Sequence, residues 1–261
     1  MKKLGFLFII FFCLPNITQA QKRYSTFEME APQLDTIKKI WVYLPLDYDT
    51  STKKYPVLYM HDAQNLFDAK SSYAGEWRID ETLDSLKAKI IIIGIEHGNN
   101  KRLSELTPYK NSKYGGGNAD AYLDFIVSTV KPYVDSVYRT KKNTRNTGIM
   151  GSSLGGLTSY YASLKYPEVF GKVGVFSPSF WFSNEIYTLT EATEKMDTKF
   201  YFMCGDSESE DMVDEMNQMI QLIREKRCDC LHLHKKHIVE NGKHNEKLWA
   251  KEFAKAYLWL F

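Results

Sequence analysis

Short apolar runs alternate with stretches of helical periodicity along most of this 261-residue chain. Continuous apolar runs predict strands that are buried on both faces. They occupy Ile40–Pro45, Tyr55–His61, Ile90–Ile95, Thr147–Gly151, Lys172–Ser177, Lys199–Gly205 and Leu233–Val239. Helical patterns occupy Ala119–Tyr138, Gly155–Tyr166, Met212–Ile223 and Glu246–Phe261. This order predicts an α/β fold with a mainly parallel central sheet and helices on both faces.

The first 20 residues predict a secretion signal. Lys2 and Lys3 precede an apolar run from Leu4 to Leu14, and small residues lead to a cleavage site after Ala20. The run is too short to cross a bilayer, which needs about 20 apolar residues. A lipid anchor at Cys13 is disfavoured because small residues do not precede it. We therefore expect residues 21–261 to be exported to the periplasm or the exterior.

Charge and length limit the remaining classes of function. Removal of Lys2 and Lys3 with the leader would leave as many basic as acidic residues. A balanced chain gives no electrostatic reason to expect nucleic acid or an anionic membrane as partner. No later stretch is apolar enough for a membrane span. The length fits one domain over residues 21–261, and the sequence says nothing of its oligomeric state.

Cysteine and histidine spacing predicts no metal site. An odd number of cysteines after the leader excludes a complete disulfide framework, and Cys204 lies in an apolar run as a small buried residue. Cys228 and Cys230 lack the second pair that a zinc site needs. His232 and His234 would share one strand face, but no third ligand is evident there.

A candidate nucleophile lies between a predicted strand and a predicted helix. Gly151-Ser152-Ser153-Leu154-Gly155 matches the pattern G-x-S-x-G, in which glycines allow a sharp turn that exposes the serine. The alternative is a tight turn whose serines cap the helix. A serine hydroxyl is a weak nucleophile at neutral pH and needs a base. Ser153 is therefore the predicted nucleophile, provided that the chain supplies a histidine.

His244 is the predicted base. In this strand-turn-helix arrangement the partners follow the serine in the order acid, then histidine, which excludes His61 and His97. His244 comes after the last predicted strand and opens the final helix, where a base belongs. The acid is expected in the segment after the strand Lys199–Gly205, and the spacing leaves four carboxylates open: Asp206, Glu208, Glu210 and Asp211.

Two backbone N–H groups should stabilise the oxyanion. One belongs to Leu154, directly after the nucleophile, and Gln64, in the loop after Tyr55–His61, is expected to supply the other. Gly115–Gly117 lies in a polar region and predicts a mobile loop at the rim of a site. A phosphate-binding role is disfavoured for this loop because no strand runs directly into it.

Several segments resemble one known family in their order along the chain: YPVLYMHDAQNLF, GEWRIDETL, YRT, IMGSSLGGL, YPEVFGKVGVFSPSFWF, GDSE and GKHNEKLW. The family is the "putative esterase" group of α/β-hydrolases, which includes esterase D-like enzymes, enterochelin and salmochelin esterases, and feruloyl and acetylxylan esterases. The resemblance covers nearly the whole chain after the leader. It implies the α/β-hydrolase fold and a serine esterase.

The resemblance also implies roles for individual residues. Ser153 would be the nucleophile, His244 in the pattern G-x-H-N-E the base, and Glu208 in the pattern G-x-x-E the acid, with Asp206 as the alternative. Relatives have glycine where this chain has Ala63, whose methyl group would tighten the oxyanion loop. The expected substrate contacts are Trp181, Phe180, His61 and Asp62; packing is an equal alternative for Trp181 and Phe180.

The leading hypothesis is hydrolysis of an acylated carbohydrate or a related small ester through an acyl-enzyme. A periplasmic esterase for siderophore trilactones and an acyltransferase on the same scaffold, similar to the mycolyltransferases, remain alternatives. A protein that only binds is disfavoured because every type of triad residue is present. The chemistry requires no cofactor, and the expected partner is a small-molecule or oligosaccharide ester.

Overall fold

A central sheet organises the part of the chain that the computed structural model describes, residues 23–194, 196–225 and 233–261. Its eight strands lie in the order β1-β2-β4-β3-β7-β8-β9-β10. Only the pairs β1–β2 and β2–β4 of this sheet are antiparallel. The strands are β1 (Tyr24–Ala31), β2 (Thr36–Tyr43), β3 (Val57–Met60), β4 (Ile91–Ile95), β7 (Thr147–Ser152), β8 (Lys172–Phe176), β9 (Lys199–Gly205) and β10 (His234–Val239). The predicted mainly parallel sheet is confirmed.

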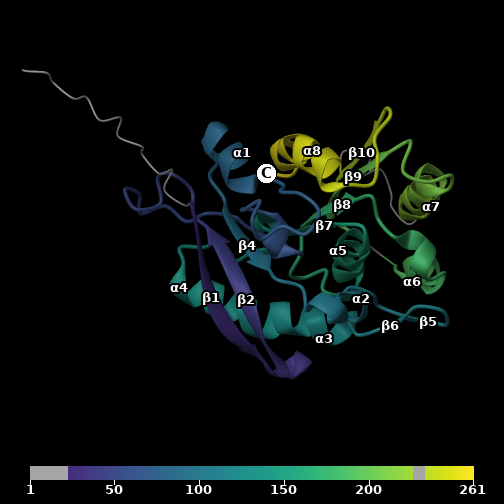
Figure 1. The fold of residues 1–261 in the computed structure, drawn as a ribbon, viewed down its shortest axis with the longest axis horizontal. Coiled ribbons are helices and arrows are strands. Elements are labelled where there is room, and N and C mark those ends of the chain that lie inside the picture. Colours follow the sequence, from purple (N-terminus) through teal and green to yellow (C-terminus); the bar gives the residue numbers. More distant parts are fainter. Residues whose placement is uncertain (1–22, 195, 226–232) are drawn as a thin grey trace, which may run out of the picture.

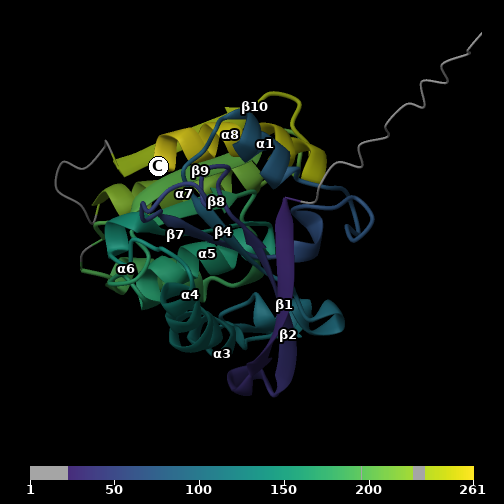
Figure 2. The ribbon, with the colours of Figure 1, turned by 90° about the vertical axis from the view of Figure 1, so that its left-hand side faces the viewer.

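Helices cover both faces of this sheet (Figures 1 and 2). They are α1 (Ile79–Ser85), α2 (Arg102–Glu105), α3 (Ala119–Asp124), α4 (Lys131–Val137), α5 (Leu154–Lys165), α6 (Glu185–Ala192), α7 (Met212–Glu225) and α8 (Glu246–Leu260). In β4, Ile91 and Ile93 face a core that includes residues of α3, α4, α5 and α7, whereas Ile92 faces a second core with α1 and α8. Because alternate residues of a strand face opposite sides of the sheet and both sides are covered, the central strands are apolar at every position.

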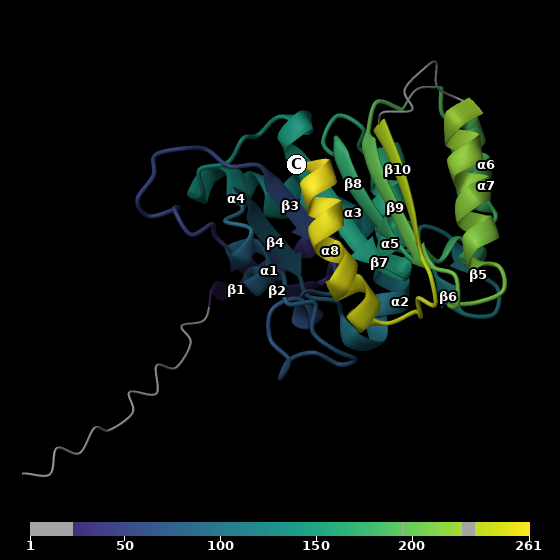
Figure 3. The same ribbon diagram turned by 90° about the horizontal axis from the view of Figure 1, so that it is seen from above.

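The sequence missed several elements, among them β1, α1 and α6. β1 alternates polar with partly buried residues and pairs antiparallel with β2, so it lacks the continuous apolar run of a central strand. α1 and α6 have only 7 and 8 residues, too few to display a helical period. Figure 3 shows α6 and α7 side by side on the opposite side of the sheet from α8.

The predicted helix Ala119–Tyr138 is one continuous helical stretch with an irregular middle. The segment Phe125–Val130 is π-helical and joins α3 to α4, which ends at Val137. Pro132 lies in the first turn of α4. Because proline has no N–H and its ring crowds the preceding turn, a regular ladder cannot continue through this point.

The remaining predictions concern the cysteines, the glycine loop and the leader. Cys204 is buried and free, as expected. The glycine loop forms a short hairpin of β5 (Lys110–Asn111) and β6 (Gly115–Gly116). The side-chain N–H of Asn111 donates a hydrogen bond to the Phe182 carbonyl at 2.8 Å. The leader, His232, Cys228 and Cys230 lie outside the described residues. Within the described residues, no helix is long and apolar enough to span a membrane.

A buried ion pair ties the antiparallel edge of the sheet to α2. Lys38 Nζ lies 2.6 Å from both carboxylate oxygens of Glu105, and the two side chains are 3% and 2% exposed. Glu105 also accepts the Gly98 N–H at 2.8 Å. Removing one partner would leave the other charge uncompensated in the interior, whereas removing both charges would not.

We expect Glu105→Gln and Lys38→Met each to lower the free energy of unfolding by about 3 kcal/mol, because each leaves one buried charge unpaired. The double variant should recover most of this loss, since the amide oxygen of the introduced glutamine can still accept the Gly98 N–H. Urea unfolding of the four proteins measures the coupling. If the double variant lost the sum of the two single effects, the pair would not be coupled as proposed.

Candidate active site

A cavity of about 760 Å³ opens at the carboxyl edge of the parallel strands. Parallel strands end at the same edge, and in α/β sheets ligands bind outside these ends. Five of the predicted site residues line this cavity together: Ser153, His244, His61, Asp62 and Gln64. Segments far apart in the sequence therefore meet around one space large enough for a small ligand.

Ser153 lies on the turn between β7 and α5 in a strained conformation. Its φ of 58° and ψ of −122° are rare for a residue other than glycine. Its N–H donates to the Phe176 carbonyl at 2.9 Å, and its own carbonyl accepts the N–H groups of Leu157 and Ser179. These bonds to neighbouring segments hold the turn and keep the serine partly exposed, as a nucleophile at this position requires.

The glycines around Ser153 are needed for close packing. A Cβ at Gly151 would lie 2.8 Å from His61 Cδ2 and 2.9 Å from the backbone of Gly155. A Cβ at Gly156 would lie 2.6 Å from the Phe176 carbonyl oxygen, whereas one at Gly155 would make ordinary contacts. The residue with positive φ on this turn is Ser153, not one of these glycines. Close packing therefore requires glycine at Gly156, one position beyond the last residue of the motif G-x-S-x-G.

His244 lies between β10 and α8 and is held by a buried carboxylate. Its Nδ1 is 2.7 Å from Oε2 of Glu208, whose side chain is 1% exposed. Oε1 of Glu208 accepts the Ser177 hydroxyl at 2.7 Å and the Gly205 N–H at 2.6 Å. The Trp249 indole N–H donates to Ser177 Oγ at 2.8 Å. This network fixes the orientation of the imidazole through its Nδ1.

Asp206 supports the loop that carries His244. Its Oδ1 accepts the Asn241 N–H at 2.8 Å, and Asp206 N–H donates to the Val239 carbonyl at 3.1 Å. Next to it, a Cβ at Gly205 would lie only 2.2 Å from the Gly242 carbonyl oxygen. The acid loop and the histidine loop therefore meet backbone to backbone. Glu210 and Asp211 are exposed on the far side of the segment.

The Ser153 hydroxyl has a different partner in the structure. It lies 3.3 Å from the Ser179 hydroxyl, and among the described residues no hydrogen bond joins it to His244. Both side chains line the same cavity. The structure thus brings the predicted nucleophile and the predicted base to one site and joins His244 to Glu208, while the Ser153 hydroxyl points to a neighbouring hydroxyl.

The predicted oxyanion donors belong to Leu154, which directly follows Ser153, and to Gln64, which lines the same cavity. Neither Leu154 N–H nor Gln64 N–H donates to a backbone carbonyl of the described residues. Gln64 belongs to a short 3-10 turn, Ala63–Asn65, that follows β3. The Ala63 methyl group is fully buried and packs on Gly94, where a Cβ would approach it to 2.8 Å. Ala63 thus fits closely against β4 at this point of the loop.

Arg102 is a site residue that the sequence did not reveal. Its guanidinium donates two hydrogen bonds to the Asp62 carboxylate, both at 2.7 Å. Burial alone would raise the pKa of Asp62, but the charge and hydrogen bonds of Arg102 outweigh burial and lower it. Asp62 has a φ of 56°. This predicted substrate contact is therefore held in an ion pair that also fixes the oxyanion loop.

Histidines and an acid complete the cavity wall. His61 is buried beneath the Ser153 turn, its Nδ1 lies 2.8 Å from the Tyr122 hydroxyl, and burial lowers its pKa to about 4. Burial also lowers the pKa of His97. Glu246, at the start of α8, is buried, and burial raises its pKa. His61 is therefore neutral at physiological pH.

The structure does not bring Phe180 or Trp181 into the wall of this cavity. Phe180 is fully buried against Tyr160 and Tyr187, so its role is packing. Trp181 is 52% exposed and contacts Tyr114 edge to face. Both residues lie on one short 3-10 turn, Phe180–Phe182, where consecutive side chains point in different directions.

The chain is similar to known proteins along most of its length. A family model described as "Putative esterase" matches residues 31–260. The uncharacterized protein YbbA of Bacillus subtilis is 29% identical over 242 residues, which cover 86% of this chain and 92% of YbbA.

Two solved structures share the fold at low identity. A ferulic acid esterase has a TM-score of 0.67 at 16% identity, over 91% of this chain and 98% of its own. The enterobactin esterase FES from Shigella flexneri has a TM-score of 0.76 at 16% identity, over 91% of this chain and 58% of its own. Together with the family match, these likenesses establish that the chain belongs to the "Putative esterase" family of α/β-hydrolases.

Proposed function

We propose that this esterase works through an acyl-enzyme on Ser153, with His244 as general base and Glu208 as the carboxylate that orients it. One observation carries the proposal. A serine on a strained turn shares a cavity with a histidine whose Nδ1 lies 2.7 Å from a buried carboxylate. This is the arrangement that activates a hydroxyl, because the carboxylate fixes the imidazole tautomer and stabilises the imidazolium.

The reaction begins when the Ser153 hydroxyl turns from Ser179 toward Nε2 of His244. Ser153 Oγ attacks the ester carbonyl carbon while Nε2 takes the proton. The negative oxygen of the tetrahedral intermediate accepts hydrogen bonds from Leu154 N–H and Gln64 N–H. Collapse of the intermediate expels the alcohol, which receives the proton from His244. Water then attacks the acyl group, His244 takes and returns a proton, and the acid leaves Ser153.

The charges of the cavity favour a neutral ester as substrate. Arg102 is already paired with Asp62 through two hydrogen bonds, and Glu246 adds a further carboxylate. Among the described lining residues no other arginine and no lysine occurs. A strongly anionic ligand would therefore meet carboxylates without a free cation. We infer that a neutral acyl ester of a carbohydrate or a related small alcohol fits better than a ferric siderophore.

Export remains part of the proposal. It rests on the sequence of residues 1–20, in which two lysines, an apolar run and a small-residue ending follow one another. An exported esterase would meet acylated saccharides outside the cytoplasm.

Ser153→Ala should abolish turnover of p-nitrophenyl acetate, with kcat falling by a factor of about 10⁴ or more, because no other group replaces the nucleophile. The matched control is Ser179→Ala, which removes the neighbouring hydroxyl and should leave turnover and labelling by a fluorophosphonate probe in place. Circular dichroism checks that both variants fold. Labelling lost in the Ser179 variant and kept in the Ser153 variant would assign the nucleophile to Ser179.

Glu208→Gln should lower kcat by a factor of about 10⁴, because an amide at this position favours the wrong tautomer of His244. Asp206→Asn makes the same change two residues away, and asparagine can still accept the Asn241 N–H. We expect this control to keep turnover within about tenfold of the parent. Steady-state kinetics of both variants decide between the two acids, and the opposite order of losses would make Asp206 the orienting carboxylate.

A substrate panel tests the inferred preference for neutral esters. We expect kcat/KM for acetylated sugars and methyl ferulate to exceed that for a ferric catecholate trilactone by at least about tenfold, because like charges repel in the cavity. The iron-free trilactone serves as the control for size, since it has the same ester core with less negative charge. A higher kcat/KM for the ferric form would favour the siderophore alternative.

A further inference from the structure

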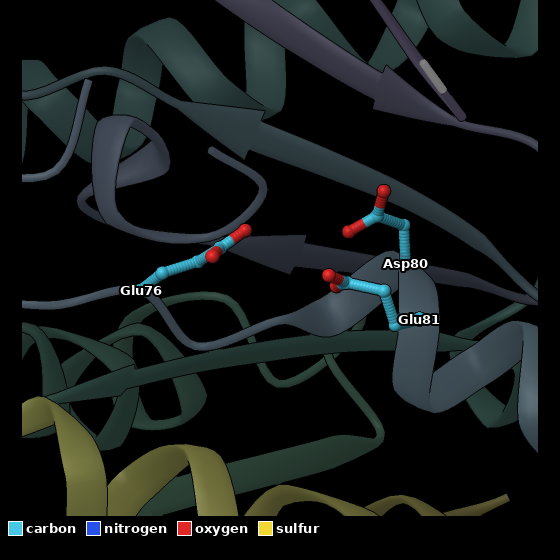
Figure 4. A group of neighbouring side chains, drawn as sticks. All are labelled: Glu76, Asp80 and Glu81. Atoms are coloured by element: carbon cyan, nitrogen blue, oxygen red, sulfur yellow. The ribbon is translucent and has the colours of Figure 1, made fainter. Parts of the chain in front are cut away.

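Three carboxylates gather at the start of α1, outside the catalytic cavity. Glu76 lies in the loop before the helix, and Asp80 and Glu81 lie in its first turn. One oxygen from each lies within 4.8 Å of the others. Figure 4 shows the three carboxylates turned toward a common space.

Asp80 is the unusual member of this cluster. The residue is 7% exposed, and its Oδ1 is buried without a hydrogen-bond partner among the described residues. Arg78 Nε lies 3.3 Å from Glu81 Oε1, and both side chains of this pair are exposed. One guanidinium cannot offset three carboxylates, and a buried carboxylate is stabilised by a charged partner, hydrogen bonds, protonation or a metal ion.

We propose that Glu76, Asp80 and Glu81 bind a divalent cation, for which Ca²⁺ is the best match. Carboxylate oxygens are hard ligands, and Ca²⁺ accepts them at 2.3–2.6 Å in flexible geometry with water completing the shell. Oxygens around Ca²⁺ are therefore separated by up to about 5 Å, which accommodates the observed spacing. Mg²⁺ requires shorter distances and a stricter octahedron. With three side-chain ligands, a dissociation constant of about 10⁻⁴–10⁻³ M is expected.

The bound cation would brace one wall of the catalytic cavity. Between Glu76 and Asp80, the N–H groups of Trp77 and Ile79 donate to the carbonyls of Asn65 and Leu66 at 2.8 and 3.0 Å. These two carbonyls belong to the loop that contains Gln64. The Trp77 ring lies 5.7 Å from Phe176 and 5.9 Å from Trp249. The cation would thus join both ends of the segment that supports the oxyanion loop.

Thermal unfolding in calcium provides the first test. For protein freed of metal by chelation, 10 mM Ca²⁺ should raise the Tm by about 3 °C or more, because a ligand that binds only the folded state stabilises it. Tb³⁺ occupies calcium sites and emits when a nearby tryptophan is excited. We expect emission through Trp77, which Ca²⁺ then displaces.

Substitutions assign the effect to the cluster. Glu76→Gln combined with Glu81→Gln, and Asp80→Asn alone, should each abolish the calcium-dependent Tm shift and the Tb³⁺ emission. Because Asp80→Asn removes an uncompensated charge, its Tm without calcium should not fall. The matched control is Glu191→Gln combined with Glu194→Gln, two exposed acids, which should respond as the parent does. An unchanged parent Tm in calcium, or equal shifts in all variants, would overturn the proposal in favour of a proton shared between Asp80 and Glu81.

Discussion

Left-handed backbone at the carboxyl ends of the strands is the constraint on which the active site depends. After β3, β7, β8 and β10 the chain passes through a residue other than glycine with positive φ: Asp62, Ser153, Ser177 and Asn241, respectively. Each such conformation costs of order 1–3 kcal/mol and persists only where the surroundings enforce it. Four such residues lie along one edge of the sheet. Their backbone conformations lower the stability of the fold, and in return they set the direction of these turns.

Hydrogen bonds between the turns hold this geometry. Ser153 N–H donates to the last residue of β8, and Ser177 N–H donates to Met203 in β9. Asp62 is fixed by Arg102, and Asn241 by Asp206. Each strained residue is thus secured by a neighbouring strand or loop. The predicted nucleophile, the predicted oxyanion loop and the histidine loop are therefore each held by contacts with neighbouring segments along this edge of the sheet.

Local sequence predicted those features that local backbone determines. The elbow at Ser153 and the loop at His244 could be placed because a strand, a turn and a helix follow one another in the chain. The choice among four carboxylates could not be made from spacing, because it depends on where Gly205 and Gly242 touch. Arg102 was missed because its partner Asp62 lies 40 residues away. Phe180 faces the core because the direction of a side chain on a short turn is set by packing.

Three buried carboxylates illustrate how surroundings decide what one chemical group does. Asp62 meets a guanidinium, keeps its charge and acts as a structural anchor. Glu208 accepts hydrogen bonds from a hydroxyl and a backbone N–H and lies beside an imidazole, and in the proposed mechanism it would stabilise the imidazolium. Asp80 has neither kind of compensation at Oδ1. The donors around each carboxylate therefore distinguish an anchor in Asp62, the proposed partner of His244 in Glu208 and a proposed cation ligand in Asp80.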